Sequence, residues 1–472
     1  MNRYNNDTIC AISTAHGVGG IAVIRVSGAD AINVVAKSWR GAEIASMKSH
    51  TAHLGRIIDV QGAILDEVVI TLFRNPNSFT GEDVVEIACH GSLWIQQQII
   101  QLLISNGCRT ATGGEFTQRS FLNGKLDLSQ AEAIADVIAS SSAASHRIAI
   151  SQMRGGFSRE LSALRDQLLD FVALMELELD FSEEEVEFAD RAQLITLAEE
   201  ISRKISRLAN SFSVGNAIKN GIPVAIVGET NAGKSTLLNT LLNEDKAIVS
   251  DIHGTTRDVI EDTINISGVT FRFIDTAGIR ETTDTIESIG IERTYQKIDQ
   301  ANIILWIIDA TTPIAQIEQI SPEILTRASG KELAILVNKS DTLTTTQQEQ
   351  IHTALSQIVS NAKEVSDSAQ IIFISAKESI GIEQIESYLI DRAQIPSNTN
   401  SDIIVTNTRH YEALTRALEA IDRALNGLHA NISGDFVSQD IRETMHYLGE
   451  ITGEISHTDI LQTIFSRFCI GK

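Results

Sequence analysis

The sequence is poor in basic residues for its length. Its 472 residues include 38 Lys and Arg against 61 Asp and Glu, which gives a formal net charge of −23 at pH 7. A field of that sign repels phosphate groups, so the composition opposes non-specific nucleic-acid binding. Contact with RNA then requires a local basic patch or a second protein.

Long apolar runs and paired cysteines are also missing. No run of 18 or more apolar residues occurs, which predicts the absence of a membrane-spanning helix. The first ten residues, MNRYNNDTIC, lack the apolar core of a secretory signal. Cys10, Cys89, Cys108 and Cys469 show neither a C-x-x-C pair nor zinc-site spacing. We therefore expect a cytoplasmic protein with free thiols.

Residues 1–125 predict an α+β domain. Three runs rich in Val and Ile, namely IAVIRVSG, DEVVITLF and EDVVEIA, predict strands. The run SLWIQQQIIQLLISNG predicts a helix that ends at Asn106-Gly107.

Two separated segments share a helical pattern. Apolar residues recur at three- and four-residue spacing after Ser129, and the pattern returns near Thr408. Each segment carries an apolar stripe that must be buried, so we expect one discontinuous helical domain from residues 126–219 and 391–472. The acidic stretch 176–190 predicts a solvated loop or helix end.

Residues 220–390 interrupt the helical domain with a different pattern. Five apolar strands are each followed by a loop and a helix: IPVAIVG, TFRFIDTAG, ANIILWIIDA, ELAILVNKSD and QIIFISAK. Continuous apolar strands in this arrangement predict a parallel sheet buried between helices. The fold class is therefore multidomain, with α/β and all-α parts.

A phosphate-binding loop is predicted at residues 228–235. The stretch GETNAGKS fits G-x-x-x-x-G-K-S, and it follows a predicted strand and precedes a predicted helix. Glycines let backbone N–H groups approach phosphate. Lys234 can reach the β- and γ-phosphates, and the Ser235 hydroxyl can bind Mg²⁺.

Three further motifs follow predicted strands: DTAG at 275–278, NKSD at 338–341 and SAK at 375–377. Asp275 can hold Mg²⁺ through water. Asp341 can accept two hydrogen bonds from guanine, which adenine does not offer in that arrangement. The order and spacing resemble the Ras-like GTPase family, and predict a Ras-like GTPase domain. The predicted GTP-binding residues are Asn231, Ala232, Gly233, Lys234, Ser235, Thr236, Ser250, Asp251, Ile252, His253, Gly254, Thr255, Thr256, Asp275, Thr276, Ala277, Gly278, Asn338, Lys339, Ser340, Asp341, Ser375, Ala376 and Lys377.

Hydrolysis of GTP needs an oriented water and a cation against the developing charge. Ile279 stands where many small GTPases place a water-orienting Gln. Arg280 is either a catalytic finger or a solvated loop arginine. In the loop 247–259, Thr256 is the expected second Mg²⁺ ligand. Asn231 can offer its side-chain carbonyl to a monovalent cation, or it is only a turn residue.

Beyond these motifs, the chain resembles the MnmE (TrmE) family of tRNA modification GTPases over essentially its full length. The resemblance rests on GETNAGKSTLLN, AIVSDIHGTTRD, DTAGIRETTDTIESIGIER, FTGEDVVEIACHG, GEFTQRSFLNGKLDL and FCIGK. It implies a potassium-stimulated GTPase in which Glu287 orients the attacking water. The metal ligands that it implies are Asn231, Ser250, Ile252 and Thr255 for K⁺, and Ser235 and Thr256 for Mg²⁺. Ser250 stands where relatives often have Thr, and His253 has no assigned role.

The resemblance also implies a reduced-folate site in the N-terminal domain. Arg25, Glu86, Lys125 and Lys472 match the family's positions for 5-formyl- or methylene-tetrahydrofolate. It places Cys469 near that pocket as a functional thiol, either a covalent catalyst or a structural contact. A nearby lysine favours the thiolate. A terminal tail is rarely anchored enough to need core packing, which argues against a buried Cys469.

For partners, the resemblance implies a homodimer, tRNA, and an FAD-containing flavoprotein of the MnmG type. Together they add an aminomethyl or carboxymethylaminomethyl group at C5 of the wobble uridine, position 34, of certain tRNAs. The dimer would form through the N-terminal and GTPase domains.

Other functions stay open on sequence grounds. One is a Ras-like switch in ribosome assembly; another is a scaffold whose nucleotide sets only the dimer state. The run GVGGIA at 17–22 precedes a predicted strand, so it is a poor dinucleotide loop. The ending CIGK is a poor prenylation signal, because Gly and Lys follow and no polybasic run precedes it.

Overall fold

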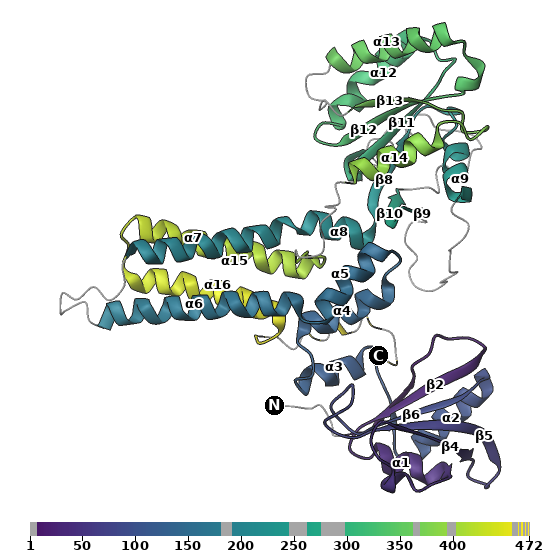
Figure 1. Ribbon diagram of the computed structural model, residues 1–472, viewed down its shortest axis with the longest axis vertical. Coiled ribbons are helices and arrows are strands. Elements are labelled where there is room, and N and C mark those ends of the chain that lie inside the picture. The colour runs from purple at the N-terminus through teal and green to yellow at the C-terminus, as the bar shows by residue number, and fades with distance from the viewer. Residues whose placement is uncertain are drawn as a thin grey trace. The chain divides into compact units, whose positions relative to one another are not determined.

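The computed structural model describes residues 7–180, 191–244, 262–274, 298–361, 369–393 and 403–455, with residues 461, 464, 465, 468 and 471 near the C-terminus. The chain forms two compact units (Figure 1). One unit comprises residues 1–138, 149–205 and 413–472, and the other comprises residues 139–148 and 206–412. The predicted fold class is confirmed, since an N-terminal α+β part, helices from two separated segments and an α/β part are all present.

The N-terminal part is built on a seven-stranded sheet in the order β3-β4-β5-β6-β2-β1-β7. Its strands are β1 (Ile9–Ile12), β2 (Gly19–Ser27), β3 (Trp39–Arg40), β4 (Thr51–Ile58), β5 (Ile64–Phe73), β6 (Val84–Gly91) and β7 (Arg109–Thr110). All neighbours pair antiparallel except β1 and β7. The helical elements are α1 (Ala31–Ser38), η1 (Ile44–Ser46), α2 (Leu93–Ser105) and α3 (Glu115–Leu122).

Side-chain alternation explains why α1 and α2 cover one face of this sheet, while α3 covers only part of the other face, at β1. Along β5, Val68 and Ile70 are buried while Val69 between them is exposed. Buried residues of α1 and α2 belong to the same apolar cluster as the inward side chains of the sheet. The predicted helix end is confirmed, because α2 is followed by its C-cap residue Asn106.

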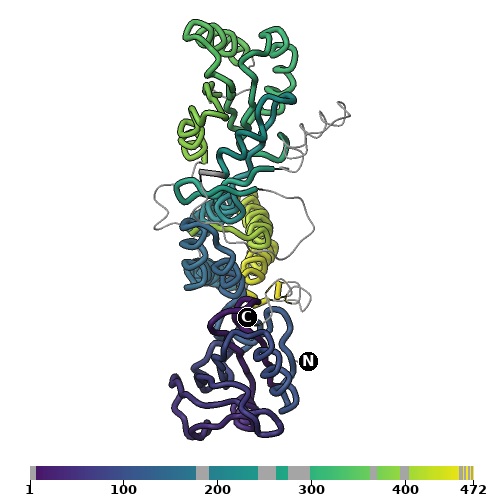
Figure 2. Tube along the Cα trace, turned by 90° about the vertical axis from the view of Figure 1, so that its right-hand side faces the viewer, coloured from purple at the N-terminus to yellow at the C-terminus, as the bar shows by residue number. Residues whose placement is uncertain are grey.

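Helices from both segments form a bundle, which Figures 1 and 2 show from two directions. The bundle helices are α6 (Gly156–Asp180), α7 (Arg191–Asn210), α15 (Thr408–His429) and α16 (Gly434–Thr452). The two segments also form α4 (Leu128–Ala139), α5 (Ala143–Met153) and α8 (Phe212–Asn220). Cross-links join α7 to α15 through Ser202 and Asp422 at 2.9 Å, and α15 to α16 through Arg423 and Asp440 at 3.0 Å. An ion pair between Arg442 and Glu176 joins α16 to α6. Apolar side chains on these four helices, among them Leu168, Ile201, Ile421 and Ile441, are fully buried, which agrees with the prediction that the two segments cover each other's apolar stripes.

The α/β part contains a six-stranded sheet in the order β13-β12-β11-β8-β10-β9. Its strands are β8 (Ile222–Val227), β9 (Asp262–Ile266), β10 (Val269–Phe273), β11 (Ile303–Asp309), β12 (Glu332–Asn338) and β13 (Gln370–Phe373). Its described helices are α9 (Lys234–Glu244), α12 (Ile314–Arg327), η3 (Ser340–Thr342), α13 (Thr345–Asn361) and α14 (Ile382–Arg392). The strands that follow β8 in the chain lie on both of its sides, with β10 on one side and β11 on the other. The carboxyl end of β8 is therefore a topological switch point, the place where α/β sheets bind ligands.

Both faces of β8 are buried, as its continuous apolar sequence predicts. Val224 belongs to the apolar cluster that includes α9 and α14, while Ala225 belongs to the cluster that includes α12 and α13. The predicted parallel pairing is confirmed for the five predicted strands β8, β10, β11, β12 and β13. The sheet also has a strand that was not predicted, β9, which runs antiparallel to β10 at one edge. Ser267 and Gly268 join these strands with φ of 50° and 85°. A two-residue turn of this type permits only antiparallel pairing.

The chain passes between the helices and the α/β part at two points that lie side by side. Val405, just before α15, donates its backbone N–H to the Ser211 hydroxyl at 3.0 Å. Gly215 in α8 packs so closely that a Cβ there would lie 2.0 Å from the Val405 carbonyl oxygen. Among the described residues, no helix combines the length and apolarity needed to cross a membrane.

Candidate functional site

The phosphate loop follows β8 in a conformation that its sequence requires. Gly228, Asn231 and Gly233 have φ of 152°, 68° and 103°. A Cβ at Gly228 would lie 2.2 Å from the Ile307 carbonyl oxygen, and one at Gly233 would lie 2.1 Å from Nδ2 of Asn338. Both positions therefore exclude a side chain, and the loop brings its backbone N–H groups to the end of the sheet.

Lys234, the first residue of α9, closes this loop. Its Nζ donates hydrogen bonds to the carbonyl oxygens of Gly228 at 2.8 Å and Glu229 at 2.7 Å. The N-terminus of a helix carries unpaired N–H groups and a partial positive charge. With the ammonium group of Lys234 beside it, this end of α9 is suited to bind a polyphosphate.

Asn338 connects the predicted base-binding motifs to the phosphate loop. Its side chain is 4% exposed, and Nδ2 donates to the Ala232 carbonyl oxygen at 2.8 Å. Its Oδ1 accepts from the Ala376 N–H at 2.9 Å, while the hydroxyl of Thr240 in α9 donates to the Ala376 carbonyl oxygen at 2.9 Å. One buried amide therefore joins the three motifs, which the sequence had placed far apart.

The rest of the NKSD motif lies at the same edge of the sheet. Lys339 has a φ of 64° and its ammonium group pairs with Asp309 at the end of β11. Burial would raise the pKa of Asp309, but hydrogen bonds from Lys339 and Thr311 outweigh it and lower that pKa. Ser340 is buried and Asp341 is exposed, so the Asp341 carboxylate is free of the core and accessible to a base.

Several predicted residues lie outside the described part of the chain. Those are Ser250, Asp251, Ile252, His253, Gly254, Thr255, Thr256, Asp275, Thr276, Ala277, Gly278, Ile279, Arg280, Glu287, Cys469 and Lys472. Of the metal ligands implied by resemblance, the structure describes Asn231, which is exposed, and Ser235, which is half-buried. Among described residues, no group of three or more His, Cys, Asp or Glu side chains is arranged to hold a metal.

In the N-terminal part, Arg25 and Glu86 are directly opposite each other on β2 and β6. Nε and Nη2 of Arg25 lie 2.9 and 2.8 Å from Oε1 of Glu86. The guanidinium carbon lies 5.5 Å from the ring centre of Phe79 and 5.6 Å from that of Phe116. The two side chains are 19% and 28% exposed, so this pair is accessible to a ligand.

Lys125 and the C-terminal tail lie in the same part of the molecule. Nζ of Lys125 donates to the Pro76 carbonyl oxygen at 3.0 Å, on the segment that carries Phe79. The Gly471 carbonyl oxygen accepts from the Ser13 hydroxyl at 3.0 Å, and Gly471 is buried. The expectation of an unanchored tail is therefore wrong at Gly471.

Comparison with known proteins tests the identity of the chain. A family model described as "MnmE helical domain" matches residues 128–469, and one described as "GTP-binding protein TrmE N-terminus" matches residues 8–125. A "tRNA modification GTPase MnmE" of Bacteroides fragilis is 59% identical over 472 residues, covering 99% of this chain and 100% of the relative. Proteins of the same name from Parabacteroides distasonis and Flavobacterium johnsoniae are 57% and 52% identical; they cover 98% and 99% of this chain and 100% of each relative.

The chain belongs to the MnmE family of tRNA modification GTPases. The predicted resemblance is confirmed by these matches, which together extend over the N-terminal and helical parts and over nearly the full length of the relatives.

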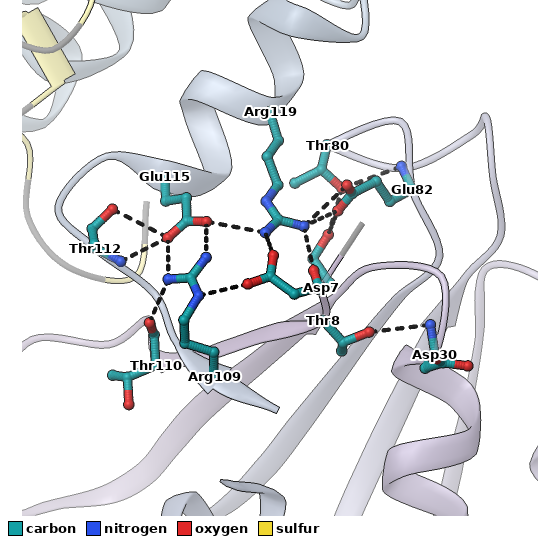
Figure 3. A network of polar contacts seen from close by, with 11 residues as sticks. Asp7, Thr8, Asp30, Thr80, Glu82, Arg109, Thr110, Thr112, Glu115 and Arg119 are labelled. Carbon is teal, nitrogen blue, oxygen red and sulfur yellow. Dashed lines mark hydrogen bonds and ion pairs between the residues drawn. The ribbon is translucent and has the colours of Figure 1, made fainter. Parts of the chain in front are cut away.

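Sequence reasoning missed a charged cluster near Arg25, which Figure 3 shows. We call it the Arg119 network: Asp7, Glu82, Arg109, Glu115 and Arg119. Two arginines share three carboxylates. The Glu115 and Arg119 side chains are 8% and 10% exposed. The signal available in the sequence was the four-residue spacing of these two residues in GEFTQRSF, which places them on one face of α3.

Glu115 is held as a carboxylate. Burial would raise the pKa of Glu115, but hydrogen bonds from the two arginines and the Thr112 backbone lower that pKa to about 2. Arg109 donates to both Glu115 oxygens at 3.0 and 2.6 Å. The negative charge is therefore fully paired inside the domain.

The three cysteines in the described part of the chain have free thiols, as predicted, and the structure shows in addition that all three are buried. They are Cys10, Cys89 and Cys108. Burial, with the nearby charge of Asp66, raises the pKa of Cys89 to about 11. Cys89 is therefore protonated at neutral pH and unsuited to nucleophilic chemistry.

Proposed function

We propose that this chain is a potassium-stimulated GTP hydrolase acting in tRNA wobble uridine modification. In this proposal it works with an FAD-containing partner of the MnmG type, and a tetrahydrofolate derivative supplies the carbon that is added at C5 of uridine 34. The product carries an aminomethyl or carboxymethylaminomethyl group. The proposed setting is the cytoplasm.

The single observation that carries the proposal is the set of hydrogen bonds around Asn338. This side chain holds the phosphate loop at Ala232 and the SAK loop at Ala376, with Asp341 exposed beside them. A nucleoside triphosphate must be bound at its phosphates and at its base at the same time. The buried amide of Asn338 fixes the separation between the phosphate loop and the SAK loop, which favours selection of guanine by Asp341. Membership of a family of tRNA modification GTPases agrees with this reading.

Metal ions would complete the GTP site. The half-buried Ser235 hydroxyl at the start of α9 is suited to Mg²⁺, with Thr256 as the second proposed ligand. Asn231 is exposed on the phosphate loop, so its side-chain oxygen is accessible to K⁺. The other proposed K⁺ ligands are Ser250, Ile252 and Thr255. Mg²⁺ and K⁺ would neutralise phosphate charge, and Glu287 would orient the attacking water.

A reduced folate is the proposed ligand of the N-terminal part. The Arg25–Glu86 pair offers both hydrogen-bond donors and acceptors beside the partly exposed ring of Phe79. A pterin ring has a flat apolar face and a polar edge, and it is joined to carboxylates that Lys125 and Lys472 can attract. Cys469 is the proposed functional thiol near this ligand.

The proposed homodimer would use the exposed part of the outer face of the N-terminal sheet, on β4 and β5. Leu54 and Val69 are opposite each other on β4 and β5, and they are 74% and 37% exposed. Neighbouring exposed apolar side chains favour association with another protein surface. The GTPase domains would supply a second dimer contact. The proposed domains are residues 1–125, residues 126–219 with 391–472, and residues 220–390.

The test is nucleoside analysis of tRNA by mass spectrometry from cells that lack this chain. We expect the C5 group on the wobble uridine to disappear, and to return with the wild-type chain or with Lys48→Ala, an exposed residue outside the site. Lys234→Ala should not restore the C5 group, because the phosphate loop then lacks the lysine ammonium group that would pair with the phosphates. Normal modification in cells without the chain would overturn the proposal and favour a ribosome-assembly switch or a scaffold.

A further inference from the structure

Arg25 is held between two aromatic rings that come from different segments. Phe79 belongs to the connection between β5 and β6, and Phe116 belongs to α3. Phe116 is fully buried, whereas Phe79 is 37% exposed. The orientation of Arg25 against Glu86 therefore depends on the distance between α3 and the β5–β6 connection.

Two neighbouring side chains of α3 contact the β5–β6 connection. The Ser120 hydroxyl donates to the backbone carbonyl oxygen of Phe79 at 2.8 Å, and Arg119 makes the ion pair at the other end of the connection. Arg119 lies one helical turn beyond Phe116 on α3 and donates to Glu82, which ends the β5–β6 connection, at 3.1 and 3.3 Å (Figure 3). Arg119 also donates to Oε1 of Glu115 at 3.0 Å and to Asp7 at 2.9 Å. A planar guanidinium has enough fixed donors to hold several carboxylates in one geometry.

Glu82 continues the connection to the strand that carries Arg25. Its Oε2 accepts from the hydroxyl of Ser27 at 2.6 Å. Ser27 is two residues from Arg25 on β2, so both side chains point to the same face of the sheet. The Ser27 hydroxyl also lies 2.7 Å from that of Thr80, which follows Phe79. These contacts connect Arg119, through Glu82, to Ser27 on the strand of Arg25 and to Thr80 next to Phe79.

We infer that Arg119 is a positioning residue for ligand binding by Arg25 and Glu86. Its contact with Glu82 fixes Phe79 relative to Phe116, and thereby aims the Arg25 guanidinium at the ligand. The inference rests on the proposed function for the identity of that ligand, a reduced folate. It does not give Arg119 any contact with the ligand itself.

Arg109 provides a matched control within the same network. It pairs with Asp7 at 2.7 Å and with Glu115 at 2.6 Å, as Arg119 also pairs with these two carboxylates. Only Arg119 reaches Glu82. Replacing either arginine by Met removes one charge from the network, buried at Arg119 and exposed at Arg109. Only Arg119→Met removes the ion pair between α3 and Glu82, and the hydrogen bond from Ser120 to Phe79 stays in both variants.

The experiment measures binding of 5-formyltetrahydrofolate to the full chain by calorimetry, together with the melting temperature and GTP turnover. We expect Arg119→Met to weaken binding at least tenfold and Arg109→Met to change it less than threefold. The loss of melting temperature should be larger for Arg119→Met, because Arg119 is the more buried of the two arginines. GTP turnover should be unchanged in both. Arg119→Lys keeps the positive charge but lacks the planar guanidinium with its fixed donors, so its folate affinity should lie between those of Arg119→Met and the wild type.

Equal affinities for the two Met variants would overturn the inference. If the wild-type chain does not bind 5-formyltetrahydrofolate, the proposed function fails instead, and crystal structures of the variants decide the inference. In Arg119→Met the Phe79 ring should leave Arg25, while in Arg109→Met it should stay. An unmoved Phe79 in Arg119→Met would contradict the positioning role whatever the ligand is.

Discussion

Asn338 donates its side-chain N–H to the carbonyl oxygen of Ala232 across 2.8 Å, from a buried position at the end of β12. Because the same amide accepts from Ala376, it sets the distance between the phosphate loop and the loop beneath the base. Nucleotide affinity should therefore depend on a residue that need not contact the nucleotide.

Asn338→Ala should weaken binding of GTP and GDP at least about tenfold. The substitution removes the two hydrogen bonds by which Asn338 holds the loops at Ala232 and Ala376, so nucleotide binding must then order loops that are no longer held together. A loss of about 1.4 kcal/mol is tenfold in affinity. Titration with fluorescently labelled GDP measures the effect. Asn361→Ala, at the exposed end of α13, is the control, and equal affinity in both variants would contradict the prediction.

GTP turnover should rise several-fold when K⁺ replaces Na⁺, and Asn231→Gly should abolish most of that rise. Asn231 has a φ of 68°, a conformation that glycine adopts without strain, so this variant removes the amide and keeps the loop. Steady-state phosphate release in the two salts is the measurement. Asn431→Gly is the control, since Asn431 has a φ of 54° in a helix connection. Equal turnover of the wild type in both salts would exclude a K⁺ site.

Acid should destabilise the N-terminal part through Glu115. The pKa of Glu115 is about 2 in the folded chain, below its ordinary value of 4.5, so the unfolded chain binds a proton more readily. The stability that Glu115 contributes is present above about pH 4.5 and is lost as pH falls towards 2. Glu115→Gln should lower stability at pH 7 but flatten its decline between about pH 5 and 3.

Hydrogen exchange of peptides from α3, followed by mass spectrometry across this pH range, reports the effect locally. Glu43→Gln is the control, because Glu43 is exposed in the same domain. An identical pH dependence in wild type and Glu115→Gln would show that this carboxylate does not control acid stability.

Gly471→Ala should release the C-terminal tail. Gly471 has a φ of 102°, and a Cβ there would lie 2.2 Å from the Ile12 carbonyl oxygen, so the side chain cannot fit without displacement. Carboxypeptidase should remove Lys472 several-fold faster than from wild type. Gly62→Ala is the matched control, since Gly62 has a φ of 87° but open space around it. Unchanged digestion would mean that the contact with β1 does not hold the tail.

The sequence predicted the features that are encoded in contiguous residues. The phosphate loop, its strand and its helix are one uninterrupted stretch, and Lys234 and Ser235 could be placed from it. The antiparallel β9–β10 edge was also encoded locally, in the Ser267-Gly268 turn, but the apolar pattern of the neighbouring strands masked that signal. A two-residue turn is decisive where side-chain periodicity is not.

Contacts between distant segments could not be predicted in this way. Arg119 and Glu82 are 37 residues apart, and Ser13 and Gly471 are 458 residues apart. Each of these residues alone reads as an ordinary surface or tail residue. Their roles follow from burial and from partners that only the folded chain brings together, as does the role of Asn338 in joining the two ends of the GTP site.

The contact between Ser211 and Val405 has a consequence for how such a chain can arise and change. The α/β part begins and ends at neighbouring points. Its insertion between the helices therefore costs little more loop-closure entropy than a short connecting turn would. A gene segment encoding a complete nucleotide switch can then be acquired, exchanged or lost between these two positions while the host helices keep their register.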